Sequence, residues 1–281
     1  MTTFLKQVLV HLDATQGIAQ RLAVARRIAD QHGAALTALY AVTPALLELP
    51  FAPEVGPIAV KTLVELDDQR RADVLKTFDQ VMSGPGPSAN WSQVNDAPIV
   101  DAFARQALFA DLLVLGQRPP SSEDTGGVPP DFVELVMAAS GRPAIVVPYV
   151  GWSLPVGETI AISWKETPEA ARAVTAALPF LRRANRVHIL TWGSESEPRI
   201  IGGHALDLDH YLKAHGVSAS WQRGGPEPRE IGELLLSRVS DLGADLLVMG
   251  CYGHSRAREW VLGGASRSVL NSMTLPVLMT H

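Results

Sequence analysis

The residues of this chain best suited to chemistry lie in a glycine-rich stretch near its C-terminus. Gly250 ends an apolar run, Gly253 follows it, and Gly263 precedes a second stretch with helical character. Glycines let a backbone approach a phosphate closely, and the free amides of a helix start attract anions. The spacing therefore predicts either a phosphate cradle or a plain strand–helix connection with two turns and a cap. The candidate cradle residues are Gly250, Gly253, His254, Gly263, Gly264, Ala265 and Ser266.

Further candidates follow other predicted strands, because a parallel sheet binds ligands beyond the carboxyl ends of its strands. In the second half of the chain, Lys165 either contacts phosphate as a point charge or lies in solvent. Trp192 either flanks a flat ligand or packs in the core or an interface. The corresponding candidates of the first half are Asp13, Thr15, Val42 and Gly116.

A long-period sequence repeat relates the candidate residues of the first half to those of the second half. Residues 110–116 read Ala-Asp-Leu-Leu-Val-Leu-Gly, and residues 244–250 read Ala-Asp-Leu-Leu-Val-Met-Gly. A proline followed by an apolar run comes soon after each copy, at Pro143 and Pro276. A repeat of this period seen twice indicates a duplicated domain rather than a solenoid. The copies diverge after the shared glycine, so we expect the halves to share a fold but not a site.

Apolar runs alternate with helical stripes through both halves. Strands that are apolar throughout, alternating with helices, predict parallel sheets covered on both faces. The proline-rich residues 43–60 predict an irregular excursion, and the Asp67-Asp68 pair a solvated helix face. The expected strands are 7–12, 35–42, 91–94, 111–115 and 144–147, then 159–163, 186–191, 218–222, 246–249 and 277–279. The expected helices are 16–33, 61–82, 99–109 and 129–139, then 167–183, 203–215, 227–242 and 265–273.

We expect two domains, residues 1–150 and 156–281, joined through the segment 148–157 with its glycines and proline. A pseudo-twofold axis should relate them, with the strands 144–147 and 277–279 meeting across it, since unpaired apolar edge strands are a liability. One chain would then do the work of a homodimer. Both a monomer of tandem domains and a homodimer of such chains are compatible with this arrangement.

Composition narrows the class of protein. The net charge is −5 with both signs interspersed, which argues against a nucleic-acid partner. We see no secretory signal and no apolar run long enough for a membrane span, so we expect a cytoplasmic protein. The one cysteine, Cys251, excludes an internal disulfide framework. It is either a reactive thiol or a small side chain tolerated beside glycines.

The glycine stretch resembles a family signature. The pattern Gly250-x2-Gly253-x9-Gly263, after a strand ending in Val-Met-Gly and before a helix and a Leu-Pro-Val-Leu strand, is similar to the universal stress protein family. The resemblance covers the whole chain as a tandem pair. It implies two Rossmann-like domains of the adenine nucleotide alpha hydrolase-like fold, each a five-stranded parallel sheet with helices on both faces. Many members bind ATP, and the resemblance implies three groups for it: this glycine loop, an aspartate after the first strand, and backbone groups after the second strand.

The sequence departs from that pattern in both halves. In the second half Lys165 stands in the aspartate position, and Gly264 stands where the family has Ser or Thr, with Ser266 nearby. In the first half Asp13 and Thr15 are present, but Pro119, Pro120, Pro129 and Pro130 occupy the region of the phosphate loop. Proline has no amide to donate. We therefore expect a degenerate site in the first domain and a nucleotide site in the second.

The leading hypothesis is a stress-response protein that binds ATP or another adenine nucleotide in its second domain. It would act as a sensor or regulator toward an unknown protein partner. Hydrolysis would be slow at most, since no carboxylate is evident there to hold Mg²⁺, and no residue is assigned a catalytic role. The alternative is an interaction or scaffold protein of the same fold that binds no nucleotide. An ATP pyrophosphatase ranks last, because its Ser-Gly-Gly-x-Asp-Ser loop is missing after both first strands.

Overall fold

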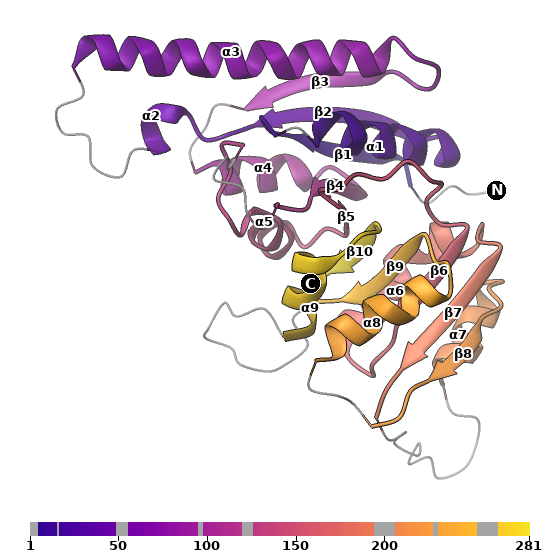
Figure 1. Cartoon of the computed structure of the whole chain (residues 1–281). Helices are drawn as coiled ribbons and strands as arrows, with labels where there is room; N and C mark the ends of the chain where they lie inside the picture. The colour runs from indigo at the N-terminus through magenta and orange to yellow at the C-terminus, as the bar shows by residue number, and fades with distance from the viewer. Residues whose placement is uncertain are drawn as a thin grey trace. The chain divides into compact units, whose positions relative to one another are not determined.

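The computed structural model describes residues 5–15, 17–48, 56–94, 98–119, 126–193, 206–226, 230–251 and 264–281. The chain forms two compact units, Met1–Ser153 and Leu154–His281. Figure 1 shows that each unit is a sheet flanked by helices.

The first unit is built on five parallel strands in the order β3-β2-β1-β4-β5. Nearly every residue of β1 and β4 is buried, as expected for a sheet covered on both faces, whereas β3 at the end of the order alternates between exposed and half-buried residues. The strands are β1 (Gln7–Leu12), β2 (Ala35–Ala41), β3 (Ala89–Val94), β4 (Leu112–Gly116) and β5 (Ala144–Val147).

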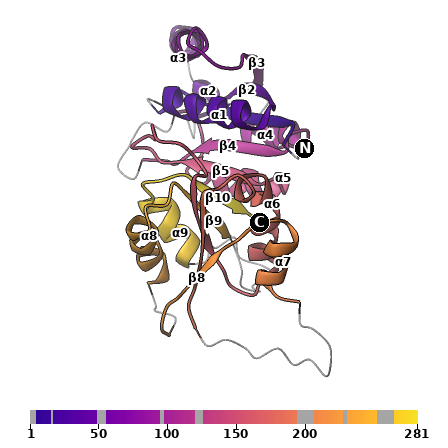
Figure 2. The same ribbon diagram turned by 90° about the vertical axis from the view of Figure 1, so that its right-hand side faces the viewer.

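Five helices connect these strands. The sheet grows from β1 to β3 in one direction and then returns to β4 and β5, so right-handed crossovers place the earlier and later helices on opposite faces. Accordingly α1 packs against α3, and α4 packs against α5 (Figures 1 and 2). The helices are α1 (Ile18–His32), α2 (Ala45–Glu48), α3 (Pro57–Met82), α4 (Ile99–Ala107) and α5 (Phe132–Ser140).

The second unit repeats this order as β10-β9-β6-β7-β8, again with parallel pairing. Thr167 directly precedes α6, and its hydroxyl caps the helix by accepting from the Ala170 amide. The strands are β6 (Thr159–Ser163), β7 (Arg186–Thr191), β8 (Ser220–Arg223), β9 (Leu246–Gly250) and β10 (Val277–Thr280). The helices are α6 (Pro168–Leu181), α7 (Leu208–Ala214), α8 (Ile231–Asp241) and α9 (Gly264–Ser272).

Strand register gives the equivalent positions of the two units. Val8 pairs with Leu112 in the first sheet, and Ile160 pairs with Leu246 in the second, where both leucines belong to the repeated sequence. Counting from these pairs, the equivalent positions are His11 and Ser163, Asp13 and Lys165, and Arg21 and Ala173. Counting from the prolines before β5 and β10, Phe132 is equivalent to Ala265 and Val133 to Ser266.

The predicted α/β class and element order are confirmed, with two corrections between β2 and β3. Residues 43–60 are not irregular throughout, because α2 lies there and α3 begins at Pro57, after the extended Gly56. Proline suits a first helical position, where no amide is needed. Asp67 is also more than a solvated charge, since its carboxylate accepts from the Ala45 amide that opens α2.

No helix in the described ranges is long and apolar enough to cross a membrane. The pseudo-twofold relation of the two halves stays a prediction.

Candidate functional site

The carboxyl ends of β1, β2 and β4 bring together the four residues expected at the first-unit site. Asp13 follows β1, Val42 follows β2, and Gly116 ends β4. Thr15 turns back on Asp13, with its amide 3.0 Å and its hydroxyl 2.5 Å from Oδ1 of that residue. Arg21, the fourth residue of α1, reaches into the same space, where a Cβ on Gly116 would lie 2.4 Å from its guanidinium.

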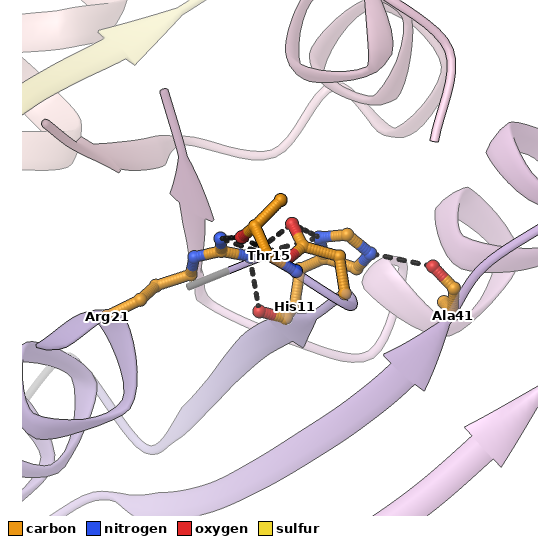
Figure 3. Close-up of polar contacts among 5 residues, drawn as sticks. His11, Thr15, Arg21 and Ala41 are labelled. Carbon is orange, nitrogen blue, oxygen red and sulfur yellow. Dashed lines mark hydrogen bonds and ion pairs between the residues drawn. The ribbon is translucent and has the colours of Figure 1, made fainter. Parts of the chain in front are cut away.

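An ion pair closes the centre of this site. Arg21 Nη1 donates to Asp13 Oδ2 at 2.9 Å, and Nη2 donates to Oδ1 at 3.3 Å (Figure 3). Both residues are buried, with relative exposures of 3% for Arg21 and 5% for Asp13. Burial alone would raise the pKa of the Asp13 carboxyl, but the facing guanidinium and the bonds to it hold that pKa at about 2. Asp13 is therefore a carboxylate with a fixed partner.

His11 lies beneath this pair, at the end of β1. Its Nε2 is 2.8 Å from the Ala41 carbonyl oxygen, which can only accept, so Nε2 carries the proton and Nδ1 faces Arg21 Nη1 at 3.4 Å (Figure 3). Its ring packs against the rings of Phe132 at 4.4 Å and Phe103 at 5.1 Å. Burial lowers the pKa of His11 to about 4, and Asp13 offsets only part of that effect. The imidazole is therefore neutral near pH 7.

The chain itself covers the top of the first-unit site. The Gly126 carbonyl accepts from the Ala14 amide at 3.2 Å, and the Gly127 carbonyl accepts from the Thr43 amide at 2.6 Å. Both glycines have positive φ, 62° and 79°, and lie close to Thr15 and Val42, leaving no room for a Cβ. The backbone groups after β1 and β2 are thus bonded within the protein.

The equivalent region of the second unit has smaller side chains and the opposite charge. Ser163, Ala173 and Ala265 stand where the first unit has His11, Arg21 and Phe132. Lys165, in the place of Asp13, is exposed after β6. A cationic side chain at a strand end therefore replaces a buried ion pair.

Gly250 has a packing role in this unit. A Cβ there would lie 2.5 Å from the amide of Ala170 and from the backbone carbon of Glu169, so the start of α6 presses directly on the end of β9. Cys251 follows as a buried residue whose thiol donates to the Thr280 carbonyl at 3.0 Å. A buried, hydrogen-bonded thiol agrees with the structural interpretation of this cysteine rather than the reactive one.

Of the predicted cradle residues, Gly253, His254 and Gly263 lie outside the described part of the chain. Gly264, Ala265 and Ser266 form the first turn of α9, where amides without helical partners are found. Ser266 is buried, whereas Gly264 is exposed, and no described residue lies within 4 Å of where its Cβ would be.

Trp192 lies after β7 and half-buries its indole against Gly224, where a Cβ would meet its Nε1 at 2.0 Å. It borders a pocket of about 100 Å³ between β7, β8 and the end of α8, which Arg223 and Arg238 also line. Both the ligand-flanking and the packing interpretations of Trp192 are compatible with this position.

The comparisons with known proteins agree with this architecture. The model of the universal stress protein family matches residues 205–281, which contain α7 to β10. The predicted resemblance to the universal stress protein family is confirmed. A universal stress protein from Archaeoglobus fulgidus shares the fold with a TM-score of 0.69 at 13% identity, over 99% of this chain and 98% of its own. No curated protein matches the sequence.

Two proteins from Pseudomonas aeruginosa share the same fold. A functionally unknown protein from strain PAO1 has a TM-score of 0.58 at 15% identity and covers 99% of this chain and 93% of its own. A putative universal stress protein from strain UCBPP-PA14 has a TM-score of 0.53 at 16% identity, with coverages of 99% and 94%. These matches establish the tandem universal stress protein fold and say nothing about a ligand of this chain.

Sequence reasoning missed the residues that fill the first-unit site. Arg21 sits in the apolar stripe of α1, and a charge at such a position is a sequence signal of a buried partner. His11 lies within an apolar strand and gave the same kind of signal. Nothing local marks Gly126 and Gly127 as neighbours of Thr15 and Val42, because that contact depends on the course of a long loop.

Acidic and histidine side chains do not gather into a metal site in the ranges described. Among those residues, no group of three or more His, Cys, Asp and Glu is arranged to hold a metal ion. Asp13, the carboxylate that follows β1, pairs with Arg21 at 2.9 Å.

Proposed function

We propose that the second unit binds an anionic ligand of the adenine-nucleotide class, with ATP as the first candidate, and that the first unit binds none. The observation that carries this proposal is the contrast between equivalent positions. Where the first unit has a buried ion pair and two aromatic rings in contact, the second has small side chains and Lys165.

The steric part of the argument concerns the first unit. A nucleotide entering there would have to displace Arg21 from Asp13 and the Gly127 carbonyl from the Thr43 amide. Removing one partner of a buried ion pair costs about 3–5 kcal/mol. Such a cost cancels the binding free energy that a weak ligand supplies, so this site is expected to stay closed.

The electrostatic part concerns the second unit. Lys165 brings a positive charge to the end of β6, and the amides at the start of α9 bring the positive end of a helix dipole. A negatively charged phosphate group would interact favourably with both the lysine and the helix dipole. Because a lysine rather than a carboxylate stands at this position, binding should depend little on Mg²⁺, and hydrolysis should be slow or absent. The protein would then act as a nucleotide sensor that reports to a protein partner.

Two measurements test the proposal. Mass spectrometry of the heat-released contents of purified protein should find an adenine nucleotide. Calorimetric titration of ATP should show binding that Lys165→Ala weakens by about tenfold, equivalent to about 1.4 kcal/mol. The matched control is Lys213→Ala, which removes the same charge from an exposed helix in the same unit. Equal loss in both variants would indicate a general charge effect and contradict the assignment.

A second candidate is an interaction module that binds no nucleotide. The contact between Gly250 and the start of α6 favours it, because packing alone then requires this glycine. The double variant Gly253→Val and Gly263→Val separates the two candidates. Unchanged ATP affinity in that variant, or no ATP binding by the parent protein, would leave the interaction module as the better explanation.

A further inference from the structure

Helix α3 presents a long surface that its own unit does not cover. It spans Pro57–Met82, 26 residues, which at 1.5 Å per residue is about 39 Å. Only Val74 and Phe78 are buried among them, and the helix lies along the outside of the first unit beside β3 (Figures 1 and 2). Its C-terminal end is fixed by Arg26, whose guanidinium donates to the Val81 carbonyl at 2.6 Å and the Gly84 carbonyl at 2.8 Å.

One exposed stripe of α3 has the spacing of a helix-pairing seam. The inner face carries Val74 and Phe78, and the stripe lies about a quarter turn away from it, at 100° per residue. Its residues recur at intervals of three and four, as in coiled coils. They are Lys61, Val64, Asp68, Arg71, Leu75 and Asp79.

These residues are accessible in the protein. Val64 is 51% exposed and Leu75 is 39% exposed. The side chains of Asp68 and Arg71 are 61% and 45% exposed, and they form an i,i+3 pair at 2.8 Å on the helix surface. An exposed pair of this kind contributes little to the stability of one chain, so both residues are available to other partners.

The stripe is complementary to itself when reversed. About a midpoint between residues 69 and 70, Val64 mirrors Leu75 and Asp68 mirrors Arg71. Lys61 falls within one residue of the position that mirrors Asp79. An antiparallel copy of the helix therefore sets apolar residues against apolar residues and each charge against its opposite. A parallel copy would oppose like charges in the centre.

We propose that α3 is an interaction surface for a second copy of this chain, paired antiparallel about a twofold axis that passes between residues 69 and 70. The contact is isologous, since each copy offers the same stripe. Two apolar pairs flank a polar centre, so the dimer is weak and depends on concentration and salt. It does not rest on nucleotide binding.

Charge reversal at the centre of the stripe tests this pairing. Sedimentation velocity of the full chain should show a reversible dimer at high protein concentration. Asp68→Arg gathers four guanidinium groups at the axis, and Arg71→Asp gathers four carboxylates, so each variant alone should be monomeric. Mixing the two variants should restore a 1:1 dimer, because D68R then faces R71D on one side of the axis and the native Arg71 faces the native Asp68 on the other. Thermal unfolding of each variant checks that the fold is retained.

A disulfide experiment fixes the direction of pairing. Cys251 is buried and is the chain's single cysteine, so new thiols report cleanly. Mixed Val64→Cys and Leu75→Cys proteins should form a cross-linked heterodimer under mild oxidation. Each variant alone should cross-link poorly, because the two identical cysteines of its dimer would lie about 16 Å apart along the helix pair.

The result that would overturn the proposal is a monomer at every concentration, or a dimer indifferent to the charge of residues 68 and 71. Failure of the mixed charge variants to associate would also overturn it. Preferential cross-linking of Val64→Cys to itself would replace the antiparallel arrangement with a parallel one and likewise contradict the proposal.

Discussion

At the end of β1 the first unit buries a carboxylate, a guanidinium and an imidazole under its own loop, whereas at the end of β6 the second unit exposes a lysine. The two sheets share their strand order and register. The difference between the two units therefore lies in the side chains at equivalent positions and not in the arrangement of the strands. Two units of the same fold can therefore carry a buried polar cluster at one strand end and an exposed charge at the equivalent strand end.

The largest expected effect comes from breaking the ion pair of the first unit. Arg21→Met should lower the free energy of unfolding by about 3–5 kcal/mol, because the buried carboxylate of Asp13 loses its partner. Urea denaturation at pH 7 measures this. The control is Arg172→Met in the second unit, whose guanidinium is 53% exposed and pairs with Glu169, and whose loss should cost under about 1 kcal/mol. Adding Asp13→Leu to Arg21→Met should recover much of the stability; no recovery would show that packing, not charge, dominates.

The second effect is a pH dependence that belongs to the first unit. The pKa of His11 is about 4 in the folded protein, whereas an unperturbed histidine has a pKa of 6.5, so the unfolded chain binds the extra proton between these values. Stability should thus be full above pH 6.5 and fall by roughly 3 kcal/mol as the pH drops to 4. Asp13, with a folded pKa of about 2, loses its contribution only below pH 4. Denaturation at several pH values should show a flatter slope from pH 6.5 to 4 in His11→Asn. An equal slope in both proteins would assign the effect elsewhere.

A third change compares the glycines that end β4 and β9. Gly250→Ala should destabilise the protein by about 1–3 kcal/mol, because the new methyl meets the backbone of α6. Gly116→Ala should cost less, since the methyl meets the Arg21 side chain, whose tip can shift more easily than a helix backbone. Thermal unfolding of both variants ranks them, and the reverse ranking would mean that the ion pair is the more rigid neighbour.

The smallest effect is expected at the start of α9. Gly264→Ala should stabilise the protein by about 0.5–1 kcal/mol, because a Cβ there meets none of the described residues within 4 Å and alanine favours helix. Nucleotide affinity should stay the same, since the amides of the first turn remain. A tenfold loss of ATP binding without loss of stability would instead show that phosphate approaches Gly264 closely.

Much of the fold follows from local sequence. Buried parallel strands are apolar throughout, so the runs at residues 110–116 and 244–250 can be recognised as strands from the sequence. Their alternation with helical stripes predicts the order of the elements. The short α2 escaped prediction because its first amide depends on Asp67, a residue distant in sequence. Helix ends were predicted within a few residues, as capping signals allow.

The site was harder to predict than the fold. Asp13, Thr15, Val42 and Gly116 were expected at one edge of the sheet because parallel strands end together, and the structure brings them together. The sequence did not predict that these residues would be covered. The covering groups are Arg21, α5 and the segment with Gly126 and Gly127, which are distant in sequence and come together only in the folded protein. The sequence repeat identifies equivalent positions in the two units, but it does not show how the side chains at those positions pack.

The closure of the first-unit site also limits how this protein can change in evolution. Its elements come from β1, from α1, from α5 and from the glycines at residues 126 and 127. No single substitution removes the ion pair, the aromatic ring and the covering backbone together, and each partial step strands a buried charge or opens a void. Opening this site would therefore take several coordinated substitutions, whereas the exposed Lys165 of the second unit can be replaced by a single one.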